Sequence, residues 1–194
     1  MRRFIRQLIG LLRSAAMFPA LFAAYLLQVC VMPRYPVGGV TASMVWPAIA
    51  VCTVCFGKLR AFWAGAFIGI LMEAMQPTLT LVSLVAYPAI AVLCAFLFAD
   101  KSQQKLEYER SLGKPGRNVS PYVRTLACAA VSVALHEVVS LVYIALGGTT
   151  LNAGHIGRSL LNVGMTTALT VPVMMLLRPL FGKPHVRRRR KKAE

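Results

Sequence analysis

Lysine and arginine are nearly absent from six long apolar stretches of this chain, and Arg124, near the start of the fifth, is the one exception. These stretches cover residues 14–32, 37–56, 61–76, 79–99, 122–146 and 160–177. A bilayer's hydrocarbon core is about 30 Å thick, and a helix of about 20 residues crosses it. Only 14% of the residues are charged and 57% are hydrophobic, whereas ordinary soluble domains are about 25% charged. The pattern predicts an all-α membrane protein, a compact bundle of six transmembrane helices.

The positive charges are distributed unevenly between alternate connections. The start of the chain carries 4 lysines and arginines, residues 57–60 carry 2, residues 100–124 carry 6, and the end from Arg178 carries 8. The other connections carry only Arg34 and Arg158. Cytoplasmic loops are enriched in lysine and arginine, so both termini are expected in the cytoplasm. Because the formal net charge of +16 is confined to these connections, a nucleic-acid partner is not expected.

The chain is expected to form one membrane domain, residues 14–180, with its first helix uncleaved and a cytoplasmic segment at residues 100–121. A basic amphipathic segment, residues 1–13, precedes this domain. A polybasic cytoplasmic tail, residues 181–194, follows it and either attracts anionic lipids or only anchors the topology. The tail residues expected to contact anionic lipid are Arg187, Arg188, Arg189, Arg190, Lys191 and Lys192.

Small residues recur every four positions in the third stretch. Ala61, Gly65, Gly69 and Glu73 therefore form one stripe on a helix. Such stripes are packing surfaces in lipid, where no hydrophobic force draws helices together. We expect this helix to be the centre of the bundle, with the stripe packing inside the chain or against a partner. Glu73 would then make a structural hydrogen bond, contact a partner or line a cavity.

A second stripe of small residues lies in the first stretch. Its members, Ala16, Ala20 and Ala24, also recur every four residues and could pack against another helix. This signal is weaker, because alanine is common in membrane helices.

His136 and Glu137 form the deepest polar pair, in the middle of the fifth stretch. Adjacent helical residues point about 100° apart, so each is expected to meet a group on a neighbouring helix. A structural or partner-binding role is the main expectation. A proton relay is the alternative, since intramembrane ionisable residues often mark proton paths.

No catalytic, cofactor-binding or metal-binding site is expected. The sequence has no phosphate-binding lysine loop, nucleophile elbow or cluster of metal ligands. The five cysteines lie in apolar surroundings and are expected to act as small packing residues.

The third and fourth stretches resemble the MreD family of rod shape-determining proteins. The residues that carry the resemblance are Gly65, Gly69 and Glu73, the short turn at Pro77, and Tyr87. The resemblance implies a bacterial inner-membrane protein without catalytic activity, folded similarly to the substrate-binding S components of energy-coupling-factor transporters. It also implies a scaffold role in wall elongation, with membrane lipids around it and an MreC-like bitopic partner. Further implied partners are a RodA-like glycosyltransferase, a penicillin-binding transpeptidase and the actin-like MreB.

Two other functions remain open at this point. The chain could be an S component that binds a vitamin, with Ala16, Ala20 and Ala24 docking a coupling subunit. It could also be a proton-coupled carrier, which would require His136 or Glu137 for transport.

Overall fold

The computed structural model describes residues 15–75, 82–99, 120–148 and 152–181. These residues form an all-α bundle, and the only strand-like pairing among them is one antiparallel bridge between Val37 and Val40. The elements are α2 (Met17–Cys30), the short 3-10 helix η1 (Met32–Arg34), α3 (Val45–Phe56), α4 (Lys58–Met75), α5 (Val82–Phe98), α7 (Pro121–Leu146) and α8 (Ala153–Phe181).

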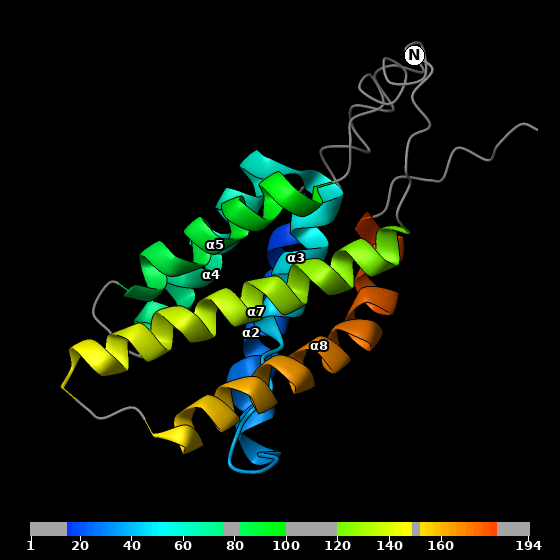
Figure 1. Cartoon of the computed structure of the whole chain (residues 1–194). Coiled ribbons are helices and arrows are strands. Elements are labelled where there is room, and N and C mark those ends of the chain that lie inside the picture. The colour runs from blue at the N-terminus through cyan, green and yellow to red at the C-terminus, as the bar shows by residue number, and fades with distance from the viewer. Residues whose placement is uncertain (1–14, 76–81, 100–119, 149–151, 182–194) are drawn as a thin grey trace, which may run out of the picture.

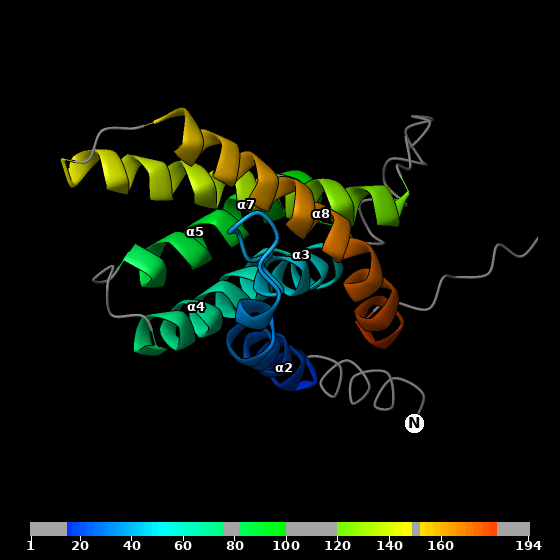
Figure 2. The ribbon, with the colours of Figure 1, turned by 90° about the horizontal axis from the view of Figure 1, so that it is seen from below.

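The helices are arranged around α3. The α7 and α8 helices run side by side on one side of it, and α2 and α4 cover the opposite side (Figure 2). The α5 helix packs along α4 and also contacts α3 and α7 (Figure 1). As a result, α3 contacts each of the other long helices.

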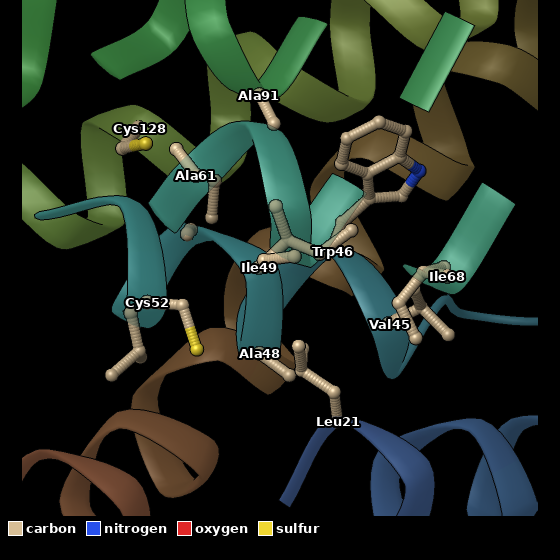
Figure 3. Close-up of a cluster of buried hydrophobic side chains, with 14 of the residues drawn as sticks. Leu21, Val45, Trp46, Ala48, Ile49, Cys52, Ala61, Ile68, Ala91 and Cys128 are labelled. Atoms are coloured by element: carbon tan, nitrogen blue, oxygen red, sulfur yellow. The ribbon is translucent and has the colours of Figure 1, made fainter. Parts of the chain in front are cut away.

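The expectation that residues 61–76 form the central helix is therefore wrong. Ten of the 12 residues of α3 are buried, whereas α4 buries only one face of its 18 residues. Leu21 of α2, Ile68 of α4 and Ala91 of α5 surround the α3 side chains (Figure 3). Both stretches are apolar on all sides, so hydropathy does not distinguish a helix surrounded by protein from one that faces lipid.

The second apolar stretch is helical only from Val45, not from residue 37 as expected. Residues 37–40 form a tight turn in which Gly38 and Gly39 adopt φ angles of 61° and 75°, which favour glycine. Pro47 lies in the first turn of α3, where its missing N–H leaves no helical hydrogen bond unmade. The proline therefore marks the start of a helix and does not kink a longer one.

The other helix ends also differ from expectation, except in α7. The sixth helix starts at Ala153, so most of the loop expected at residues 147–159 is helical. The basic turn expected at residues 57–60 is reduced to Gly57 (φ 84°), because α4 starts at Lys58. The α7 helix starts at Pro121, one residue before the expected position, and ends at Leu146 as expected.

Within the described residues, three segments are long and apolar enough to cross a membrane. They are Met17–Arg34, which contains α2 and η1, and the helices α7 and α8. The α3 and α5 helices are apolar but shorter, and α4 carries Lys58, Arg60 and Glu73. The fold is thus a helical bundle compatible with a membrane. The expected amphipathic segment 1–13 lies outside the described residues. So do the tail residues expected to contact lipid and residues 100–119 of the expected cytoplasmic segment.

Candidate functional site

Gly65 and Gly69 lie at the α4–α5 interface. A Cβ atom on Gly65 would be 2.7 Å from both the Cα of Pro88 and the carbonyl oxygen of Tyr87. A Cβ atom on Gly69 would be 3.0 Å from the carbonyl oxygen of Ser83. Only glycine permits this approach of two backbones. The stripe is therefore covered by the chain's own α5 at these two positions, and a partner helix cannot occupy them.

The remaining members of the two stripes are buried to different degrees. Ala61 is buried in the core, and Glu73 is half-buried near the end of α4. On α2, Ala24 is buried and Ala20 packs partly against the core, whereas Ala16 is exposed. The α2 helix contacts α3 and α4, so the second stripe faces the bundle interior only in its later part.

His136 belongs to an aromatic cluster with Trp46 and Tyr87. The Trp46 and Tyr87 rings stack with centroids 4.6 Å apart, and the His136 ring lies 5.3 Å from each of them. The three residues come from α3, α5 and α7 and are separated by many residues in the sequence. Trp46 and Tyr87 are buried, so this cluster joins three helices and leaves no open site between its rings.

Glu137 contacts α8, whereas His136 contacts α3 and α5. Glu137 takes part in a chain of hydrogen bonds. The Asn162 side-chain amide donates to Glu137 Oε1 at 2.6 Å, and the Thr166 hydroxyl donates to Asn162 Oδ1 at 3.1 Å. Thr166 Oγ1 in turn accepts a hydrogen bond from the backbone N–H of Ser43 at 3.0 Å. We call Glu137, Asn162, Thr166 and Ser43 the polar chain.

The polar chain ends at the start of α3. There the backbone N–H of the next residue, Met44, donates to Oε1 of Gln28 on α2 at 2.6 Å. Polar groups without a partner are costly in an apolar environment, so these bonds fix where α3 begins. Sequence reasoning identified Glu137 and missed Gln28, Asn162 and Thr166. The spacing of Asn162, Thr166 and Thr170, four residues apart in an apolar stretch, was the available signal.

An apolar groove lies between η1 with the following loop and the middle of α8. Its volume is about 450 Å³. It is lined by Met32, Tyr35, Ala42, Met165, Ala168, Leu169 and Pro172. Since Pro172 has no N–H, the carbonyl of Ala168 lacks the usual hydrogen bond from four residues later. The groove offers a surface for apolar groups and few polar groups to orient a hydrophilic ligand.

The ends of five helices meet at one end of the bundle, which we call the basic end because it contains Lys58, Arg60, Arg124 and Arg178. Lys58 Nζ lies 3.6 Å from the centroid of the Phe96 ring, and the Arg178 guanidinium carbon lies 4.7 Å from that of Tyr122. The Phe56 and Phe181 rings pack against each other with centroids 5.4 Å apart. These contacts bring together residues from α3, α4, α5, α7 and α8.

The five cysteines differ in exposure, and three of them belong to the buried core. Cys52, Cys94 and Cys128 are buried in the core, and Cys94 accepts a hydrogen bond from Ser132. Among the described residues, no three His, Cys, Asp or Glu side chains are placed to hold a metal ion.

Comparison with protein-family models, with curated proteins and with solved structures finds no match to this chain.

Proposed function

We propose that this chain is a non-catalytic scaffold of a bacterial inner membrane, similar in role to the MreD proteins of the wall-elongation complex. In this role it binds other membrane proteins through its outer helical faces. Its partners would include an MreC-like bitopic protein, directly or within an assembly that also holds a RodA-like glycosyltransferase, a penicillin-binding transpeptidase and an MreB-like filament.

The observation that carries this proposal is the way the polar chain is satisfied inside the molecule. Glu137 is bonded to Asn162, and Thr166 links this pair to the backbone of Ser43. A substrate-binding protein for a hydrophilic ligand instead presents convergent polar groups to a cavity. The described groove is apolar, so it favours a scaffold over a vitamin-binding S component.

The proposed membrane arrangement has six crossings with the basic end in the cytoplasm. The alternating helix directions support it, because Lys58, Arg60, Arg124 and Arg178 belong to one end of the bundle while Arg34 belongs to the connection at the other. At about 1.5 Å per residue, α3 is only about 18 Å long. The loop before α3 would therefore complete this crossing, with its backbone shielded by α8 and α2.

Depletion of the protein in its own bacterium tests the scaffold function. Loss of rod shape, together with co-purification of an MreC-like protein in mild detergent, is the expected result. A nutrient requirement in cells of normal shape would contradict the scaffold and favour an S component. In that case, one vitamin from a panel would raise the melting temperature of the purified protein in a saturable way.

A further inference from the structure

The basic end has an excess of positive charge within the described residues. Lys58 and Arg60 are exposed in the first turn of α4, and Arg124 and Arg178 are half-buried on α7 and α8. The only acidic residues in the described part are Glu73 and Glu137. Glu73 is near the opposite end of α4, and Glu137 is bonded to Asn162 in the second half of α7. Neither of these two carboxylates is therefore at the basic end.

Arg178 is the cation whose position is best defined. Its Nη1 donates a hydrogen bond to Thr125 Oγ1 at 3.2 Å, and its guanidinium lies against the ring of Tyr122. The Thr125 hydroxyl accepts this bond and donates its own proton to the carbonyl of Pro121 at 2.9 Å. The side chain is thus fixed between the first turns of α7 and the last turns of α8.

This geometry leaves most of the guanidinium available as a hydrogen-bond donor. A guanidinium has five N–H groups, and only one bond to a described residue is formed. Its planar fork matches phosphate oxygens, and basic sites between helices at the cytoplasmic surface favour anionic headgroups. Exposed apolar side chains at the same end of the bundle, among them Val123 on α7 and Leu180 on α8, provide a surface for acyl chains.

We propose that Arg178, positioned by Tyr122 and Thr125, binds the phosphate of an anionic phospholipid. Lys58 and Arg60, each placed next to an aromatic ring, add positive potential at the same end. The site is made of described residues of α7 and α8 and does not include the polybasic tail. The proposal requires that the chain lies in a membrane, but it does not depend on which protein the scaffold binds.

The test uses the full chain purified in a neutral detergent. Phosphatidylglycerol and phosphatidylcholine with the same acyl chains are added, and bound lipid is counted by native mass spectrometry. The wild type is expected to retain phosphatidylglycerol selectively. Arg178→Gln is expected to weaken this binding by about fivefold or more. The matched control is Arg158→Gln, the same change at the other end of the same helix, which is expected to bind as the wild type does.

Three results would overturn the proposal. The first is equal phosphatidylglycerol binding by Arg178→Gln, and the second is an equal loss in Arg158→Gln, which indicates diffuse attraction to the whole chain. The third is that inorganic phosphate displaces the lipid at equimolar concentration, because the site would then recognise the anion alone.

A second variant covers the case in which Arg178→Gln does not fold. Arg178→Lys keeps the charge and loses the planar fork, so weaker phosphatidylglycerol binding is expected. Unchanged binding by Arg178→Lys would contradict a role for the positioned guanidinium. None of these measurements involves cell shape or partner proteins, so failure here is distinguishable from failure of the scaffold function.

Discussion

Gly65 and Gly164 are both glycines within apolar helices, but their surroundings differ. Gly65 is buried where α4 meets the backbone of α5 at Tyr87 and Pro88. Gly164 is exposed on α8, and a Cβ atom there would have no neighbour within 4 Å. At the scale of single residues, glycine is required at the first position by close packing and is only tolerated at the second.

The same substitution should therefore have opposite effects at these two positions. Gly65→Ala is expected to destabilise the protein by about 1–3 kcal/mol, because its Cβ would force the two backbones apart. Gly164→Ala is expected to be neutral or to stabilise by up to about 1 kcal/mol through lower entropy of the unfolded chain. Thermal unfolding of both variants in detergent measures the difference. Equal melting temperatures would show that α5 does not press on Gly65.

Substitutions in the polar chain separate hydrogen bonding from ionisation. Asn162→Leu removes the donor to Glu137 and the acceptor for Thr166. The free energy of unfolding is expected to fall by about 1–3 kcal/mol, because these two polar groups lose their hydrogen-bond partner. Glu137→Gln retains an oxygen that accepts the Asn162 hydrogen bond, so a much smaller decrease in the free energy of unfolding is expected. Thermal unfolding measures both variants.

The Glu137→Gln variant also distinguishes a scaffold from a proton-coupled carrier. Glu137→Gln is expected to restore rod shape in depleted cells, because a scaffold does not need a titrating group at this position. Loss of complementation by Glu137→Gln, with normal stability and membrane level, would contradict the scaffold and favour a proton relay.

At the scale of elements, α3 determines how the bundle is assembled. It is short, it is buried along most of its length, and its start is held by Gln28 on α2 and Thr166 on α8. The α4–α5 pair packs on one side and the α7–α8 pair on the other. The two tryptophans of the chain lie in different layers, since Trp46 is buried on α3 and Trp63 is 55% exposed on α4.

The two tryptophans should therefore respond differently to substitution and to lipid. Trp46→Ala is expected to lower the free energy of unfolding by about 3–5 kcal/mol, because it removes the ring that packs against Tyr87 and His136. Trp63→Ala should have a much smaller effect on stability. In single-tryptophan variants made with phenylalanine, brominated lipids should quench Trp63 fluorescence strongly and Trp46 fluorescence weakly. The reverse order would contradict the central position of α3.

At the scale of the whole molecule, the basic end and the loop before α3 are expected on opposite sides of a membrane. Leu59, at the basic end, and Val37, in that loop, are both exposed, with 73% and 54% of their surface accessible. In a background in which the native cysteines are serine, Val37→Cys should react with a membrane-impermeant maleimide from outside spheroplasts. Leu59→Cys should react only after the membrane is opened. Labelling of both positions from the same side would contradict the proposed topology.

The sequence allowed the class of fold and the ends of α7 to be predicted. Ser120 and Pro121 are typical of a helix start, and Gly147 and Gly148 are typical of a helix end. It did not allow the start of α3 to be predicted, because an apolar segment has the same hydropathy whether it is extended or helical. The polar chain was missed for a different reason: Glu137 and Asn162 are 25 residues apart, and their pairing depends on how α7 faces α8.

The hydrogen bond between Ser43 and Thr166 joins residues 123 positions apart in the chain. A ribosome adding 5–20 residues per second needs about 6 to 25 s to make the intervening segment. During that interval the backbone N–H of Ser43, just before α3, lacks this hydroxyl acceptor. Until α8 has been made, the start of α3 can therefore be held only by the earlier contact between Met44 and Gln28.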